Sequence, residues 1–158
     1  MEDLYDSLFS SSQFFIEQLA RLILPEVPED GPWLVLVGPE RKIWTDDRTR
    51  FQHHFPDPQA LLSYCEHIED GQDPVLGSMG GVCLIGSELY TERFPVGYLF
   101  VVLPGYTRAT AQANLALMEL FFSQMRLLCN LLDKNNQFHQ LHLNHLSRTS
   151  KVLSGRPD

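Results

Sequence analysis

Residues 110–146 read TAQANLALMELFFSQMRLLCNLLDKNNQFHQLHLNHL, a stretch that contains neither proline nor glycine. Leucine, phenylalanine and methionine recur through it at helical spacing, which predicts one helix. At about 1.5 Å per residue, such a helix is on the order of 55 Å long, which exceeds the width of a small domain. We therefore expect part of this helix to extend beyond the folded body.

One set of positions along this helix alternates between steps of four and three residues, as the contact positions of a coiled coil do. We expect the chain to form a homodimer, as a helical bundle or coiled coil, through this seam. Its predicted interface comprises Phe121, Met125, Leu128, Leu132, Asn135 and His139, and the same spacing continues to His142 and Leu146. The polar residues of the seam should weaken the pairing and so make it switchable.

Upstream of this helix, helical and strand-forming segments alternate. Residues 3–24 have leucine at helical spacing, and a Ser10–Gln13 capping box predicts one broken helix or two short ones. Residues 33–37 and 43–45 are rich in strand formers and predict a hairpin. Asp57, as an N-cap before Pro58, predicts a short helix that ends near His67.

Two more strands are predicted at residues 82–85 and 96–103, where apolar runs end at turn residues. Residues 46–57 are polar, and residues 68–80 contain several glycines, so both segments are expected to be loops. The resulting order of elements predicts an α+β fold, with a mostly antiparallel sheet flanked by helices.

Composition narrows the class of protein. The chain has 158 residues with 12 basic and 20 acidic side chains, and its net charge of −8 opposes binding to nucleic acids. The longest clearly apolar run, Val96–Leu103, is far shorter than the roughly 20 residues that span a membrane. Cys65, Cys83 and Cys129 cannot all pair with one another and are expected to be buried free thiols. A soluble, cytoplasmic protein is therefore expected.

No pattern in the sequence indicates catalysis or a metal site. The Gly-rich phosphate-binding motifs and the Gly-x-Ser-x-Gly motif are absent. His139, His142 and His145 step by three residues and so spread around the helix, whereas two ligands on one helix usually lie four apart. They are expected to be solvated or to set the register of two chains, with a pH-sensitive helix pair as the alternative. No enzymatic activity, metal or cofactor is predicted.

The aromatic residues concentrate in the central body. Most are expected to fill the core, but the two long loops could cover a sheet face and leave a small apolar pocket there. The residues predicted to line this pocket are Trp44, His54, Tyr64, Cys83 and Tyr98. A completely filled core is the alternative.

Residues 94–105 read FPVGYLFVVLPG and precede the long helix. They resemble the closing pattern of GAF domains, in which a Gly-x-Leu-x-Val strand and a short loop lead to a terminal helix that continues into a coiled coil. A helix near Phe14–Ile23 followed by the strand Trp33–Val37 is similar to the start of that family, and PAS domains share the plan. The resemblance covers about residues 12–135. It implies a GAF-like sensory or regulatory domain at residues 1–135 and a helical linker toward an output domain or partner at 136–158.

The resemblance implies a role in bacterial-type signal transduction, of the two-component or transcription-regulator type. Binding of a ligand or partner would pass through the terminal helix to an effector. The Asn-Lys signature of cyclic-nucleotide-binding members is absent, and Glu66 follows Cys65 where bilin-binding members have Cys-His. Any small-molecule ligand is thus unidentified. The alternatives are a non-catalytic interaction and dimerisation module with no ligand, and a fragment of a sensor kinase.

Overall fold

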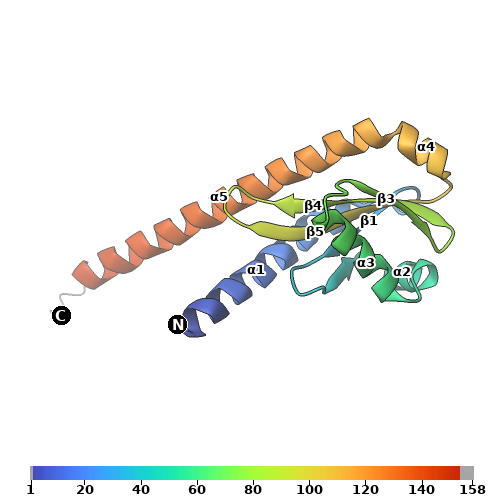
Figure 1. The fold of residues 1–158 in the computed structure, drawn as a ribbon. Helices are drawn as coiled ribbons and strands as arrows, with labels where there is room; N and C mark the ends of the chain where they lie inside the picture. Colours follow the sequence, from blue (N-terminus) through green and yellow to red (C-terminus); the bar gives the residue numbers. More distant parts are fainter. Residues whose placement is uncertain (1, 154–158) are drawn as a thin grey trace.

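The computed structural model describes the backbone of residues 2–153 and the side chains of residues 13–146 and 148. It is an α+β fold with one five-stranded sheet of order β2-β1-β5-β4-β3 (Figure 1). Each pair of neighbouring strands is antiparallel, which confirms the predicted fold class. The strands are β1 Trp33–Val37, β2 Ile43–Thr45, β3 Val75–Met79, β4 Val82–Tyr90 and β5 Pro95–Leu103.

Helices cover both faces of the sheet. One face packs against α1 (Glu2–Ile23) and α5 (Leu115–Leu153). The other packs against α2 (Arg48–His54) and α3 (Pro58–Glu69). The short helices η1 (Leu24–Glu26) and α4 (Arg108–Ala113) connect these elements to the strands. In Figure 1, α5 and the N-terminal half of α1 extend past the sheet in the same direction.

The central strand β5 is buried on both faces. Its residues alternate: Leu99 and Val101 face α1 and α5, whereas Phe100 and Val102 face α2 and α3. Successive side chains of a strand point to opposite faces of a sheet, so each layer of helices receives every second residue. This explains why residues 96–103 form a continuous apolar run and not an alternating pattern.

Two segments that the sequence predicts as loops contain regular structure. Within residues 46–57, Asp47 caps α2 by accepting a hydrogen bond from the backbone nitrogen of Arg50 at 3.1 Å. Phe51 and Phe55 lie four residues apart and are both buried, so they anchor this segment to the sheet. Within residues 68–80, Val75–Met79 form β3 at the edge of the sheet.

The boundaries of the long helices also differ from the predictions. The backbone of α1 continues without a break through Ser10–Gln13, so the predicted capping box is not the start of a helix. The terminal helical segment is interrupted at Asn114, where α4 ends before α5 begins. With 39 residues, α5 is about 58 Å long. It runs through the predicted linker as far as Leu153, and residues 154–158 lie outside the described part of the chain.

Candidate interaction site on the terminal helix

The structure does not bring together the five residues that were predicted to line a pocket. Trp44 and Cys83 lie on the sheet face that packs against α1 and α5, whereas Tyr64 and Tyr98 lie on the opposite face. His54 is also on that opposite side, where its Nδ1 is 2.9 Å from the carbonyl oxygen of Gly80. The sheet separates the two groups, so they do not line one cavity.

Beneath α2 and α3, large side chains fill the space. Trp33, Phe55 and Phe100 are each at most 2% exposed. Nearby, the Tyr98 hydroxyl donates a hydrogen bond to the carboxylate of Glu69, and Arg41 forms an ion pair with the same carboxylate at 2.9 Å. These bonds from Tyr98 and Arg41 hold the pKa of Glu69 below its usual value, while burial raises the pKa of Tyr98. Tyr98 thus belongs to a partly exposed polar cluster with Arg41 and Glu69.

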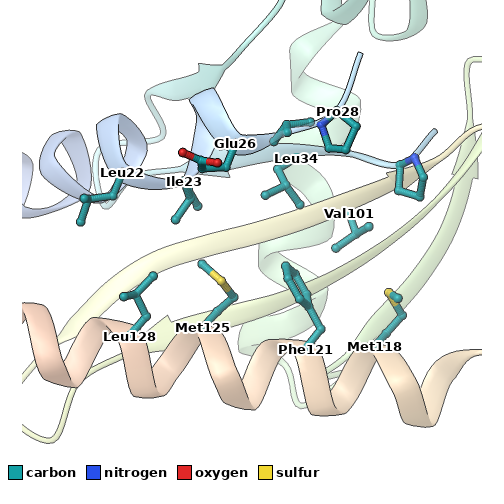
Figure 2. A pocket seen from close by; sticks show the side chains of 12 residues that line it. Leu22, Ile23, Glu26, Pro28, Leu34, Val101, Met118, Phe121, Met125 and Leu128 are labelled. Carbon is teal, nitrogen blue, oxygen red and sulfur yellow. The ribbon is translucent and has the colours of Figure 1, made fainter. Parts of the chain in front are cut away.

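An apolar groove lies on the other side of the sheet, between α1 and α5. Its volume is about 520 Å³. Figure 2 shows side chains of α5 pointing across it toward β1, β5 and the end of α1. The residues that line it include Leu22, Leu34, Val101, Met118, Phe121 and Leu128. The groove is therefore an apolar surface that α5 shares with the body.

A second apolar surface on α5 faces outward. Six large side chains, which we call the outer stripe, are each between 51% and 72% exposed. Together with Gln124 and Lys134, these residues follow steps of three and four, which is coiled-coil spacing. The outer stripe consists of Leu117, Leu120, Leu127, Leu131, Phe138 and Leu141.

The predicted dimer seam lies on a different face of α5. Met125 and Leu132 are only 8% exposed because they pack into the core of their own chain. Phe121 and Leu128 are half-buried beside the groove, whereas Asn135 and His139 are exposed. Met125 and Leu132 are thus largely covered by their own chain, and Met125 also lines the groove. Both sets of positions have the same spacing, so periodicity alone could not distinguish the packed face from the exposed one.

By length and composition, one stretch of α5, Leu115–Leu146, could also cross a membrane. It is the one such stretch among the described residues, and most of it is exposed. Arg126, Asp133 and Lys134 interrupt this stretch, so the sequence contains no uninterrupted apolar run of that length. Its inner face packs against the sheet, since Phe122 and Cys129 are at most 1% exposed.

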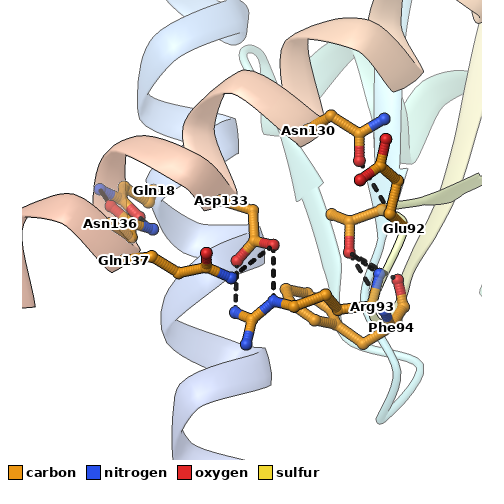
Figure 3. A network of polar contacts seen from close by, with 9 residues as sticks. Gln18, Glu92, Arg93, Phe94, Asn130, Asp133, Asn136 and Gln137 are labelled. Carbon is orange, nitrogen blue, oxygen red and sulfur yellow. Dashed lines mark hydrogen bonds and ion pairs between the residues drawn. The ribbon is translucent and has the colours of Figure 1, made fainter.

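The turn between β4 and β5 holds α5 to the body (Figure 3). Arg93 donates two hydrogen bonds to the Asp133 carboxylate, from Nε at 2.9 Å and from Nη2 at 2.6 Å. The backbone nitrogen of Glu92 donates to the side-chain oxygen of Asn130 at 2.8 Å. In the same turn, the ring of Phe94 packs edge-on against Phe15 of α1, with centroids 5.2 Å apart. One turn therefore contacts both long helices.

Polar contacts also fix the rotation of α5 about its own axis. On the side away from the groove, Arg126 donates to the Ser87 hydroxyl at 2.5 Å and to the backbone oxygen of Glu88 at 3.1 Å. Near the point where α5 leaves the sheet, the side-chain amides of Gln18 and Asn136 exchange two hydrogen bonds, of 3.1 and 2.9 Å (Figure 3). These contacts keep the outer stripe facing away from the body.

The three cysteines are free and buried, which confirms that prediction. Burial raises the pKa of Cys65 to about 11 and that of Cys129 to about 12. Because the thiolate is the reactive form, we expect the native protein to react very slowly with a thiol reagent such as Ellman's reagent at pH 8. Denaturant should expose three reactive thiols per chain. Rapid reaction of the native protein would contradict the buried placement.

Comparison of the chain with models of protein families, with curated proteins and with solved structures finds no match. Among the residues that the structure describes, no three histidine, cysteine, aspartate or glutamate side chains are grouped so that they could hold a metal ion.

Proposed function

We propose that this chain is a non-enzymatic, GAF-like regulatory module that forms a homodimer through α5 and passes a signal to an effector domain or partner protein. The outer stripe carries this proposal, because its six large apolar side chains are more than half exposed. Leaving these apolar side chains in water is unfavourable by about 25 cal/mol per Å² of apolar surface. Surfaces of this kind are typical of sites where proteins meet a partner.

A second helix fits the outer stripe better than a lipid bilayer does. Steps of three and four residues match a helical partner, whereas a bilayer requires apolar residues on every side of a helix. The inner face of α5 is apolar but packs against the sheet, and Arg126 and Asp133 beside it are bonded to the body, so lipid could not surround this helix. We therefore propose a soluble, cytoplasmic protein whose α5 meets α5 of a second copy.

Regulation would act through the surfaces that adjoin the outer stripe. Phe121 lines the groove and lies one helical turn from Leu117, and Leu128 similarly adjoins Leu131. A small apolar ligand in the groove would therefore touch the same helix that meets the partner. Such a ligand shifts the pairing only as far as its affinities for the paired and unpaired states differ.

The proposal predicts that replacing both Leu127 and Leu131 with glutamate converts a dimer into a monomer. Four carboxylates per dimer would then lie in an apolar contact, and the dissociation constant should rise by more than about 100-fold, or about 2.7 kcal/mol. Light scattering after size exclusion would measure a mass near the 18.1 kDa of one chain, in place of twice that value.

A matched control places the same charges elsewhere on α5. Gln140 and Asn144 are exposed and lie off the outer stripe, so replacing both with glutamate should leave the dimer intact. A wild-type protein that stays monomeric at all concentrations would disprove the proposal. Binding of the wild type to phospholipid vesicles, lost in the Leu127 and Leu131 variant, would indicate a membrane partner instead.

A further inference from the structure

We infer that the two copies of α5 pair in antiparallel orientation, so that Gln124 of each chain lies opposite Lys134 of the other. This inference rests on the proposed function and specifies the geometry of its interface. It follows from where the two polar residues interrupt the outer stripe.

The contact positions of the outer stripe fall into two alternating classes. In a parallel pair of identical helices each position meets its own copy, whereas in an antiparallel pair each class meets the other. The first class is Leu117, Gln124, Leu131 and Phe138, and the second is Leu120, Leu127, Lys134 and Leu141.

A parallel pair would bring like residues together. The Lys134 ammonium groups of the two chains would lie opposite each other in the contact, where they repel. Gln124 would likewise meet its own copy. Two Gln124 amides can exchange hydrogen bonds, so the repulsion between the Lys134 groups is what disfavours this pairing.

One antiparallel register matches every position with a suitable partner. When Leu127 lies opposite Leu131, the remaining apolar pairs are Leu117 with Leu141 and Leu120 with Phe138. Gln124 then lies opposite Lys134, where its side-chain oxygen can accept a hydrogen bond from the ammonium group. These four kinds of pair each occur twice because the two chains are identical.

Other antiparallel registers do not match. Moving one chain by a heptad in one direction places Lys134 opposite Leu117, and moving it in the other direction places Lys134 opposite Leu131. In both cases Gln124 also faces a leucine. A lysine or glutamine that faces leucine in a helical contact loses hydration without gaining a partner.

The flanks of the outer stripe favour the same orientation. The flank toward the groove includes Phe121 and Leu128 and becomes polar at Asn135, whereas the opposite flank is polar and includes Ser123 and Gln137. In an antiparallel pair like flanks face each other, so Leu128 meets its own copy near the two-fold axis. In a parallel pair Leu128 would face Ser123 of the second chain.

The decisive test is Gln124→Glu, because its effect has opposite signs in the two orientations. In the antiparallel dimer it creates two Glu–Lys pairs, and the dissociation constant should fall by about 3- to 10-fold at low salt. In a parallel dimer it places two carboxylates together, and the dissociation constant should rise. Sedimentation equilibrium measures the constant, and the gain should shrink at high salt because ions screen the pairs.

The control is to introduce Gln124→Glu into a chain that already carries Lys134→Gln. No ammonium group then faces the new carboxylate, so the affinity of the dimer should not increase. A gain that persists in this background would overturn the inference. A dimer that Gln124→Glu weakens would also overturn it, while leaving the proposed dimerisation standing. Only a monomeric wild type would remove the proposed function itself.

Disulfide exchange gives an independent readout. Chains with Gln124→Cys and chains with Lys134→Cys, distinguished by a mass tag, are mixed in a glutathione buffer; the buried native thiols do not interfere. We expect the disulfide between the two different variants to dominate. A disulfide between two Gln124→Cys chains, or no mixed disulfide from an intact dimer, would overturn the antiparallel orientation.

Discussion

Replacing Met125 with glutamate should unfold the body of the protein. Met125 is 8% exposed and belongs to the core between α1, α5 and the sheet. A carboxylate there would face the apolar lining of the groove and lose most of its hydration without gaining a partner. We expect the free energy of unfolding to fall by about 3–5 kcal/mol, as it does when an unpaired charge is left in a protein interior. Urea denaturation followed by circular dichroism measures this loss.

The control for this experiment is Leu127→Glu, only two residues away on the same helix. Leu127 is 51% exposed, so the substitution should change the stability of the monomer by no more than about 0.5 kcal/mol. The two variants thus separate the packed face of α5 from its exposed face. A Met125→Glu protein that remains fully folded would show that the seam predicted from the sequence is accessible.

Alanine at Gly97 should also destabilise the fold strongly. Gly97 has a φ of +148°, and a Cβ atom there would lie 2.3 Å from the backbone carbonyl oxygen of Val37 in the neighbouring strand. That oxygen cannot move away without disturbing the pairing of β1 with β5. Steric overlap and the strained backbone together should lower the free energy of unfolding by about 3 kcal/mol or more. The midpoint of urea denaturation gives the measurement.

Gly105 provides the comparison for Gly97. Its φ is +75°, but a Cβ atom there would meet nothing within 4 Å. Gly105→Ala should therefore lower the free energy of unfolding only through the strained backbone, by about 1–2 kcal/mol. Equal losses in the two variants would show that the contact with Val37 is unimportant. The close approach of β1 gives a physical reason for the glycine in the Gly-x-Leu-x-Val pattern of β5.

The elements that could be predicted from the sequence are those whose apolar pattern fits only one type of secondary structure. The long helix, the hairpin of β1 and β2, the strand β5 and the helix that follows Asp57 are all present. The missed elements are α2, where the composition is polar apart from Phe51, and β3, where Gly77 and the neighbouring glycines favoured a loop. Only their packing against the sheet distinguishes them from connecting segments.

The candidate site was harder to predict than the fold. Two sets of positions in α5 have coiled-coil spacing, and only packing shows which one the body covers. The pocket prediction combined Cys83 with Tyr98, although these residues point to opposite faces of the sheet. The hydrogen bond between Arg93 and Asp133 joins residues 40 positions apart, and no local sequence pattern predicts such a contact.

The packed face and the exterior face of α5 can change independently of each other during evolution. Residues such as Phe122 and Cys129 hold the body together, whereas Leu120 and Leu127 contribute little to it. If the chain pairs as proposed, mutations on the exterior face can accumulate while the body stays folded, so the specificity of pairing can diverge between copies of a gene. The same separation would let a protein engineer design variants of this helix that pair only with their own copies, on one unchanged fold.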